Sequence, residues 1–392
     1  MFKIQTLNTI SSTGLNQFPH DKYEVSSSFD EPDVILLRSY DLHQTTLPSS
    51  VKAVGRAGAG TNNIPVAALT ERGIPVFNTP GANANAVREL VIGGMLLASR
   101  HICQAWQYVN TLKQDSRNLH EEIEKNKKQF VGIELMGKTL GVIGLGSVGV
   151  KVANAAIHLG MQVIGYDPTI TVHRAWELSS QVKQMHSIDD LLMEADFVSF
   201  HVPLTELTKN MINHSRFQCM KTGVVLLNFA RDGIIETQAL LDALKEKKVS
   251  CYVTDFPSAE LMQHPAVINL PHLGASTREA EENCAMMIAN QIRQFLELGT
   301  ITNSVNFPTV EAPALTGVTR LAIVNANIPN MVAQISSVLA SAKLNIVGLL
   351  NQSRNDIAYT LIDINNDVPI QVLKQLAAIQ GVMQVRVLSV VT

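Results

Sequence analysis

The residues with the clearest chemical meaning form a glycine pattern and the acid that follows it: Gly144, Gly146, Gly149 and Asp167. In such a pattern the first glycine makes a tight turn, the second lets a pyrophosphate approach the backbone, and the third lets a helix pack against a strand. Ser147 and Val148 would begin a helix whose free N–H groups face the phosphates. Asp167 can accept hydrogen bonds from a ribose diol and would repel a 2′-phosphate. The pattern therefore predicts an NAD site rather than an NADP site.

The segments around the glycines have the order that such a site needs. Leu140–Ile143 is a short apolar run that predicts a strand, and apolar residues recur at helical spacing from Val148 to Leu159. Met161–Tyr166 predicts a second strand, which ends at Asp167. A glycine pattern alone is a weak signal, but strand, turn, helix, strand and acid in this order favour dinucleotide binding.

More polar side chains follow predicted strands further along the chain. They are His201, Pro203, Arg231, Asp255 and His272, after the predicted strands 197–200, 223–228, 249–253 and 267–270. Ligands of open parallel sheets bind beyond the carboxyl ends of the strands. Each residue alone could be a solvated loop residue, but together and beside a nucleotide loop they predict an active site.

This set of side chains suits hydride transfer between a nicotinamide and a 2-oxo or 2-hydroxy acid. Arg231 has the fork geometry and the permanent charge to orient a carboxylate or a carbonyl oxygen. A histidine can exchange the hydroxyl proton near neutral pH. A nearby carboxylate such as Glu260 would raise the pKa of that histidine and hold its tautomer. The nicotinamide carries the hydride, so no metal is expected.

The composition narrows the classes of protein. The chain has 392 residues, 46% of them hydrophobic and 17% charged, which predicts two or three domains with ample cores. The net charge of -3 predicts neither a nucleic-acid partner nor a membrane partner. Four cysteines without C-x-x-C spacing predict neither a zinc site nor disulfides. The chain lacks an apolar run of the ~20 residues that a membrane helix needs and lacks a signal-peptide pattern, so we expect a cytoplasmic protein.

Short apolar runs alternate with helical patterns along most of the chain, which predicts parallel sheets covered by helices. Before the glycine pattern, strands are expected at 34–37, 51–54 and 74–77, and helices at 64–72 and 85–102. A polar stretch, 113–129, leads into the glycine-loop unit. Beyond Asp167, helices are expected at 188–193, 237–248 and 277–298.

The last part of the chain has a different pattern. Residues 307–317 hold two prolines and predict a linker. Strands are then expected at 320–324, 346–350, 357–364 and 382–388, and helices at 330–342 and 368–378. This βαββαβ order is the ferredoxin-like pattern. Because the segment is small and poor in clustered ionisable residues, we interpret it as a binding or regulatory module.

Motifs along nearly the whole chain resemble the family of D-isomer-specific 2-hydroxyacid dehydrogenases, and most of all those members that act on 3-phospho-D-glycerate and carry a C-terminal ACT domain. The motifs lie at 37–39, 55–62, 73–81, 137–146, 201–204, 228–231 and 271–277. The resemblance implies a Rossmann-type doubly wound parallel sheet inserted in a flavodoxin-like substrate domain, followed by a ferredoxin-like α+β ACT domain. It places the substrate-binding domain at 1–98 and 278–310, the NAD-binding domain at 99–277 and the ACT domain at 317–392.

The resemblance also assigns roles to residues. It implies that Arg231, Glu260 and His272 are catalytic, with Glu260 and His272 as an acid/base couple. The implied cofactor-binding residues, besides the glycine loop and Asp167, are His201, Pro203, Thr208, Ala230, Asp255 and Gly274. The implied substrate-binding residues are Arg38, Ser39, Arg56, Gly58, Ala59, Gly60 and Asn83. The implied effector-binding residues of the ACT domain are Asn325, Asn327 and Asn345.

The sequence departs from the family pattern at several positions. Asp41 stands where some relatives carry a lysine for the substrate phosphate, so Arg38 and Arg56 would hold that group, with help from a neighbouring subunit. Asn325 stands where a histidine is typical. Asn330 replaces a glycine at the entry to a helix, where an asparagine tolerates the left-handed backbone region better than most residues.

Three functions follow as hypotheses. The first is NAD-dependent oxidation of 3-phospho-D-glycerate to 3-phosphooxypyruvate, the first step of L-serine biosynthesis. The second is a glyoxylate or hydroxypyruvate reductase of the same family, and the third is a non-enzymatic NADH-sensing scaffold. The expected partners are a small phosphorylated hydroxy acid, L-serine at the ACT domain unless that domain only dimerises, and further copies of the chain in a dimer or tetramer.

Overall fold

The computed structural model describes residues 1–112, 119–313 and 316–388. Its contacts divide the chain into two compact units. The first unit comprises Met1–Asn83 and Glu281–Thr392, and the second comprises Ala84–Ala280. The chain crosses between the units at the start of helix α3 (Ala84–Arg100) and near the start of helix α11 (Arg278–Leu298). The border predicted at residue 98 therefore falls inside α3, and the C-terminal module groups with the N-terminal residues.

The N-terminal part of the first unit is a five-stranded parallel sheet with the order β2-β1-β3-β4-β5. Its strands are β1 (Phe2–Thr6), β2 (Tyr23–Ser26), β3 (Val34–Leu37), β4 (Ala53–Arg56) and β5 (Val76–Phe77). This order is the flavodoxin-like one. The resemblance had implied it, and the fold confirms it.

Helices cover both faces of this sheet. Helix α11 buries Ile288, Ile292 and Phe295 in one core, and helix α2 (Val66–Glu71) buries Leu69 in the other. Helix α1 (Ser12–Leu15) approaches α11 so closely that a Cβ at Gly14 would lie 2.3 Å from the carbonyl carbon of Ala285. Only glycine allows that contact.

The C-terminal module has the predicted ferredoxin-like βαββαβ order. Its elements are β13 (Thr319–Ala326), α12 (Met331–Ser341), β14 (Ile346–Arg354), β15 (Ile357–Ile364), α13 (Ile370–Ala377) and β16 (Val382–Leu388). The strands form an antiparallel sheet with the order β14-β15-β13-β16. Asn330 precedes α12 with φ 72°, so the asparagine does adopt the left-handed conformation.

A buried arginine ties this module to the linker before it. The Arg320 guanidinium donates to both carboxylate oxygens of Asp363, over 2.7 and 3.0 Å. It also donates to the carbonyls of Leu298 and Pro313, which lie at the two ends of the segment that precedes the module. Tyr359 adds a hydrogen bond of 2.8 Å to the carbonyl of Gly299.

We expect the Asp363→Asn variant to lower the free energy of unfolding of this unit by about 3 kcal/mol, because it leaves a buried guanidinium without its counter-charge. The Arg320 and Asp363 side chains are only 3% and 9% exposed. The measurement is urea unfolding followed by hydrogen exchange in β13 and β15. Asp189→Asn is the matched control, because its ion pair is exposed and its loss costs less than about 1 kcal/mol. Equal losses in the two variants would contradict the prediction.

The second unit is a seven-stranded parallel sheet with the order β12-β11-β10-β9-β6-β7-β8. Its strands are β6 (Thr139–Ile143), β7 (Gln162–Tyr166), β8 (Lys183–Gln184), β9 (Phe197–Phe200), β10 (Val224–Asn228), β11 (Val249–Thr254) and β12 (Val267–Asn269). Read from β8, this is the Rossmann strand order, and it confirms the predicted fold class. The order reverses between β6 and β9.

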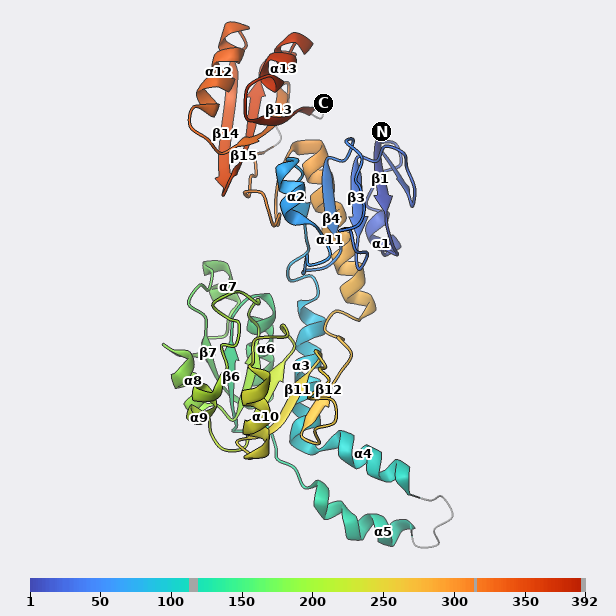
Figure 1. Cartoon of the computed structure of the whole chain (residues 1–392), viewed down its shortest axis with the longest axis vertical. Coiled ribbons are helices and arrows are strands. Elements are labelled where there is room, and N and C mark those ends of the chain that lie inside the picture. Colours follow the sequence, from blue (N-terminus) through green and yellow to red (C-terminus); the bar gives the residue numbers. More distant parts are fainter. Residues whose placement is uncertain (113–118, 314–315, 389–392) are drawn as a thin grey trace. The chain divides into compact units, whose positions relative to one another are not determined.

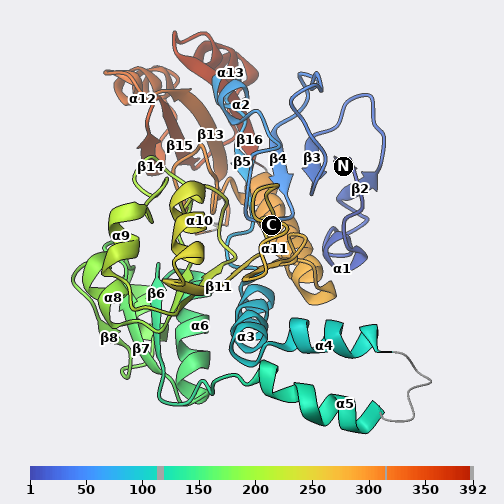
Figure 2. The same cartoon turned by 60° about the horizontal axis from the view of Figure 1, so that its bottom comes forward.

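Helices pack on both faces of the second sheet (Figure 1, Figure 2). One face carries α3 and α6 (Ser147–His158). The other carries α8 (Ile188–Glu194), α9 (His214–Cys219) and α10 (Thr237–Lys245). The predicted helix 237–248 was too long, because Lys247 takes φ 59° and the helix ends at Lys245.

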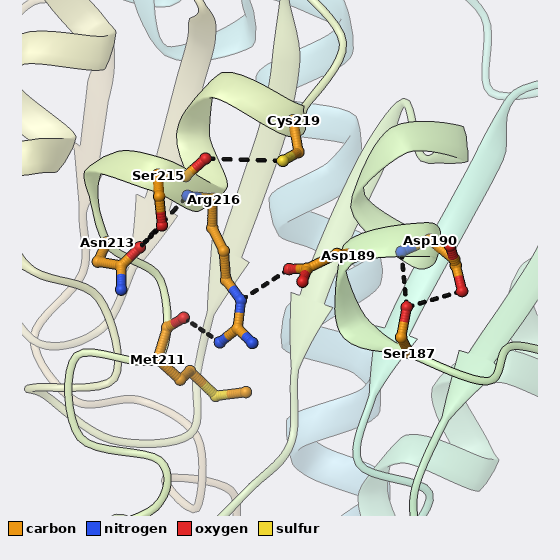
Figure 3. Close-up of polar contacts among 8 residues, drawn as sticks. All are labelled: Ser187, Asp189, Asp190, Met211, Asn213, Ser215, Arg216 and Cys219. Atoms are coloured by element: carbon orange, nitrogen blue, oxygen red, sulfur yellow. Dashed lines mark hydrogen bonds and ion pairs between the residues drawn. The ribbon is translucent and has the colours of Figure 1, made fainter.

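Side-chain caps begin α8 and α9, and an ion pair joins the two helices (Figure 3). Ser187 accepts from the N–H of Asp190, and Asn213 accepts from the N–H of Arg216. Arg216 also donates to Asp189 over 2.9 Å. These contacts stabilise the helix starts on this face of the sheet.

Two helices extend away from this sheet side by side in both views (Figure 1, Figure 2). They are α4 (Ile102–Thr111) and α5 (Leu119–Asn126), and a 3-10 turn, η1 (Lys127–Phe130), follows α5. The sequence analysis predicted only a polar connection for 113–129, of which 113–118 lie outside the described residues. In the described part of the chain, no helix has the length and apolar character to span a membrane.

Candidate active site

The three glycines after β6 have the steric environments that the dinucleotide prediction requires. Gly144 has φ 91°, and a Cβ there would lie 2.6 Å from the carbonyl oxygen of His201. A Cβ at Gly149 would lie 1.9 Å from the carbonyl oxygen of Gly144. A Cβ at Gly146 would meet no heavy atom within 4 Å, so this backbone faces open space that a pyrophosphate can enter.

The N-terminus of α6 offers unpaired donors to that space. Gly146 is the N-cap and supplies no side-chain cap. The N–H groups of the first turn, including those of Ser147 and Val148, therefore have no partner within the helix. Together with the helix dipole, these N–H groups favour an anion.

Asp167 ends β7 as predicted and also shapes the glycine loop. One carboxylate oxygen accepts from the N–H of Leu145 over 2.8 Å, and the other accepts from the N–H of Thr169 over 2.8 Å. The carboxylate is half-buried and keeps free lone pairs. It can therefore hold the loop and still accept a hydrogen bond from a ribose hydroxyl.

Arg174 is a residue that the sequence analysis missed. It lies in helix α7 (Val172–Glu177), donates to the Ser147 hydroxyl over 2.6 Å, and is held by Glu177 at 2.5 Å. Hydrogen bonding to Arg174 keeps the pKa of the Glu177 carboxyl below its usual value. The guanidinium thus lies against the first residue of α6, where the phosphates are expected. No spacing rule could have found it, because α7 was not predicted.

We expect Arg174→Met to raise KM for NAD about five- to tenfold, as the loss of one partly solvated charge-assisted contact implies. The turnover number should stay near the wild-type value, because Arg174 lies beside the phosphate end of the site. Steady-state kinetics with varied NAD measure both constants. Lys151→Met, on the exposed side of α6, is the control. An unchanged KM in Arg174→Met would show that the guanidinium only supports the loop.

His201 follows β9 at the position where the strand order reverses. Its ring nitrogen lies 2.9 Å from the Ser199 hydroxyl, and burial lowers the pKa of the imidazole to about 3. The ring is therefore neutral at physiological pH. In the same loop, the Thr208 hydroxyl donates to the carbonyl of Pro203 and accepts from the N–H of Thr205, which closes a turn.

His201 predicts an acid-sensitive stability. Its pKa falls from 6.5 in the unfolded chain to about 3 in the folded protein, so protons bind the unfolded state more strongly. Its contribution to stability is present above pH 6.5 and is lost as the pH falls toward 3. Urea unfolding across this range should show a smaller pH dependence in His201→Gln than in wild type. The exposed His186→Gln is the control, and equal slopes in all three proteins would contradict the prediction.

The turn after β10 presents Arg231. The Asn228 amide donates to the carbonyl of Arg231 over 2.9 Å, and its oxygen accepts from the N–H of Ala230 over 3.2 Å. The Arg231 side chain is exposed and donates to the carbonyl of Ala230 over 2.6 Å. Asn228 therefore fixes the turn through the backbone and leaves the guanidinium accessible, a role that the sequence analysis did not assign to it.

Asp255, at the end of β11, has an unused acceptor. The residue is 1% exposed, and one carboxylate oxygen accepts from the N–H of Gly274 over 3.0 Å. The other oxygen is buried and has no hydrogen-bond partner among the described residues. Burial raises the pKa of this carboxyl, and the charges of His272 and Arg231 act to lower it. A buried acceptor that lacks a donor fits the amide NH₂ of a nicotinamide.

His272 is placed by its backbone. Its N–H donates to the carbonyl of Asp255 over 3.0 Å, and the residue takes φ 50° in the left-handed region. Its ring packs edge-on against Phe256, with 4.9 Å between the centroids, and remains exposed. Arg231, Asp255 and His272 thus meet at the carboxyl ends of β10, β11 and β12.

Glu260 lies in the exposed turn after β11, and its own backbone N–H lowers the pKa of its carboxyl. Among the described residues, no hydrogen bond or ion pair joins Glu260 to His272. The predicted acid/base couple is therefore not formed in this structure, and the role of Glu260 stays a prediction.

The first unit holds the residues predicted to bind substrate. Arg56 donates to the carbonyls of Arg38 and Gly60, so its guanidinium supports the loop 57–60. Arg38 forms an ion pair of 2.7 Å with Glu281. Both predicted phosphate-binding cations therefore contact the protein itself, and Arg38 would have to exchange Glu281 for a phosphate.

The other predicted substrate residues lie at the same end of this sheet. Thr79 donates its N–H to the carbonyl of Gly58, and Asn78 donates to the carbonyl of Ala59. These contacts join the loop 57–60 to the segment that follows β5. Ser39, exposed, accepts from Asn8 over 2.9 Å, and Asn83 is half-buried at the end of the unit.

The predicted effector residues lie on or beside strands of the C-terminal module. Asn325, in β13, is 1% exposed, and its side-chain oxygen has no hydrogen-bond partner among the described residues. Asn327 donates to the carbonyl of Asn355, and Asn345 is exposed just before β14.

Within the described residues, no cluster of three or more His, Cys, Asp or Glu side chains is arranged to bind a metal ion. The four cysteines are free thiols.

Comparisons with known proteins agree with this geometry. Residues 92–274 match the family model described as D-isomer specific 2-hydroxyacid dehydrogenase, NAD binding domain. The chain is 34% identical over 347 residues to D-3-phosphoglycerate dehydrogenase of Haemophilus influenzae, which covers 86% of this chain and 81% of the relative. It is 38% identical over 300 residues to D-3-phosphoglycerate dehydrogenase of Methanocaldococcus jannaschii, which covers 74% of this chain. The match spans only 54% of that relative's length.

Solved structures show the same fold. A cofactor (NAD+)-bound 3-phosphoglycerate dehydrogenase from Entamoeba histolytica aligns with TM-score 0.60 and 27% identity, over 78% of this chain and 98% of the other. A glyoxylate reductase from Paecilomyes thermophila aligns with TM-score 0.63 and 26% identity, over the same shares. The chain belongs to the D-isomer-specific 2-hydroxyacid dehydrogenase family and is an NAD-dependent oxidoreductase.

Proposed function

We propose that this enzyme oxidises 3-phospho-D-glycerate to 3-phosphooxypyruvate with NAD, the first step of L-serine biosynthesis. The observation that carries the chemistry is the cluster of Arg231, Asp255 and His272 at the carboxyl ends of β10, β11 and β12, on the sheet edge that also carries the glycine loop after β6. The observation that favours this substrate is the identity to relatives named D-3-phosphoglycerate dehydrogenase.

The proposed chemistry assigns one task to each side chain. Bound NAD would supply the hydride acceptor for C2 of the substrate. His272 takes the hydroxyl proton as the C2 carbonyl forms, and returns it in the reverse reaction. Arg231 binds the carboxylate or the carbonyl oxygen and stabilises charge there. Asp255 accepts from the carboxamide and thereby orients the nicotinamide ring.

In the first unit, the loop 57–60 would bind the substrate carboxylate through the N–H groups of Ala59 and Gly60, because those of Ala57 and Gly58 already donate to the carbonyls of Leu37 and Arg56. The carbonyls of Gly58 and Ala59 accept from Thr79 and Asn78, which holds the loop in place. Arg38 and Arg56 would neutralise the phosphate. Arg38 must then leave Glu281, its partner in this structure.

The ion pair between Arg38 and Glu281 supports a second candidate function, a glyoxylate or hydroxypyruvate reductase, because such an enzyme needs no residue to bind a substrate phosphate. NADH oxidation separates the two functions. We expect kcat/KM to be at least about tenfold higher with 3-phosphooxypyruvate than with hydroxypyruvate or glyoxylate, as one additional charge-assisted contact implies. A preference for the unphosphorylated acids would favour the reductase, and no turnover with any of them would favour a nucleotide-sensing scaffold.

We also propose that the chain is a homo-oligomer. Helix α4 supports this because it has no buried residues, and Trp106 and Val109 are 70% and 51% exposed on it. Exposed apolar side chains of this size mark interaction surfaces. Light scattering that gave the mass of a single 42.8 kDa chain would contradict the proposal.

We further propose that L-serine binds the C-terminal module and inhibits the enzyme. The unpartnered oxygen of Asn325 supports an amino-acid ligand, because a ligand amine could supply the missing donor. Initial rates with and without L-serine test this proposal. Unchanged rates together with unchanged calorimetric heats would favour a module that only dimerises.

A further inference from the structure

A cavity of about 420 Å³ lies within the first unit, where β16 of the C-terminal module meets β1 and the end of α11. Its charged lining residues are Lys22, Lys52, Glu297 and Arg386, and its apolar lining includes Phe2 and Leu296. Small-molecule sites typically have volumes of about 300–1,000 Å³ and combine apolar walls with a few polar groups. The cavity has no role in the chemistry proposed above.

Arg386 forms no ion pair among the described residues. Its Nη2 donates to the carbonyls of Phe295 and Leu296, over 3.2 and 3.4 Å, and its guanidinium stacks 4.3 Å from the centroid of the Phe295 ring. Its Nη1 is buried and has no hydrogen-bond partner among the described residues. A half-buried cation without an ion-pair partner favours the arrival of an anion. Burial lowers the pKa of this guanidinium, and the charge of Asp33 acts to raise it.

The neighbouring carboxylates are already engaged with other groups. Lys52 lies 2.6 Å from Asp33, and Lys22 lies 3.8 Å from Glu297. Glu297 also accepts from the hydroxyl of Tyr23 over 2.6 Å and pairs with Arg293 at 3.4 Å. One carboxylate is thus shared among several donors, which leaves the cavity with an excess of positive charge around Arg386.

We propose that this cavity is a second binding site, which takes a small organic anion with a carboxylate or phosphate group. The negative group lies against Arg386 and Lys22, and the carbon skeleton lies against Phe2 and Leu296. Because these residues come from β16, from the N-terminal sheet region and from α11, a bound anion strengthens the packing of the C-terminal module on that sheet. The site is separate from the asparagines assigned to an amino-acid effector.

The test measures thermal unfolding of the full-length protein with inorganic phosphate or succinate, against sodium chloride at equal ionic strength. The variants are Arg386→Met, which keeps an apolar stem of similar length, and Lys22→Gln, in case Arg386→Met fails to fold. Lys374→Gln, exposed on α13 and outside the cavity lining, is the control. Hydrogen exchange in β1, β16 and the end of α11 locates the site, because an anion at Arg38 would protect other segments.

At a tenfold excess over Kd, the anion should raise the Tm of the wild type and of Lys374→Gln by about 3 °C. The increase in Tm should be absent in Arg386→Met. In Lys22→Gln, the same increase should require a higher anion concentration. A rise in Tm with phosphate alone would show that the cavity binds a phosphate group. A rise with succinate would show that it binds a carboxylate group. The proposal is overturned if neither anion exceeds the chloride effect, if all variants respond alike, or if the protection appears elsewhere.

Discussion

His272→Asn is expected to lower kcat by about 10²- to 10⁴-fold, the range that a positioned general acid or base contributes. Asparagine is the better probe than alanine, because position 272 has φ 50° and asparagine tolerates the left-handed region. The backbone N–H that bonds to Asp255 is kept, so the loop should survive. The loss then reports on the imidazole.

Steady-state rates in both directions measure this effect. Oxidation requires a neutral imidazole and reduction requires a protonated one, so the wild-type rate should fall toward acid for oxidation and toward alkali for reduction. His201 cannot cause either of these pH dependences, because burial lowers its pKa to about 3. His186→Asn, exposed and outside the site, is the control. NADH binding should be unchanged, and near-normal turnover in His272→Asn would refute the role of His272.

Arg231→Ala is expected to lower kcat/KM by about 100- to 1,000-fold, as the loss of one preorganised donor to a developing charge implies. The fold of the turn should persist, because Asn228 bonds to the backbone carbonyl of residue 231 and not to its side chain. The variant should therefore bind NADH with an unchanged Kd. Kinetics with 3-phosphooxypyruvate and fluorescence titration with NADH measure the two quantities.

Arg231→Lys separates geometry from charge. A lysine keeps the positive charge but lacks the planar fork that binds a carboxylate through two parallel hydrogen bonds. Its activity should lie between those of wild type and Arg231→Ala. If both variants kept wild-type kcat/KM, the exposed guanidinium would have no part in substrate binding.

The elements with strong local signals could be predicted from the sequence. The glycine pattern and the buried strands such as Phe197–Phe200 follow from rules that act within a few residues. The left-handed Asn330 followed from the family pattern, in which a glycine stands at this position. The strand order followed from the resemblance and is confirmed in both parallel sheets. The predicted ends of helices were less reliable. Helix α10 ends at Lys245 because Lys247 adopts a left-handed conformation, which no residue type at that position predicts.

The contacts that tune the site could not be predicted, because they join residues far apart in the chain. Arg174 reaches Ser147 from a helix without a clear apolar period, and Glu281 reaches Arg38 across most of the sequence. The missing bond between Glu260 and His272 is likewise a matter of side-chain position in an exposed turn. Such features depend on packing, which periodicity and motif spacing do not describe.

The Arg320 guanidinium has a consequence for engineering the C-terminal module. The guanidinium donates to Asp363 and to the carbonyls of Leu298 and Pro313. The stretch 299–313 is therefore a loop held at both ends and not a flexible linker. A chimera that joins a foreign domain at residue 317 would lack Arg320, so the loop 299–313 would lose the side chain that holds its two ends. A domain exchange at this junction must therefore include residues 299–313 in the exchanged segment.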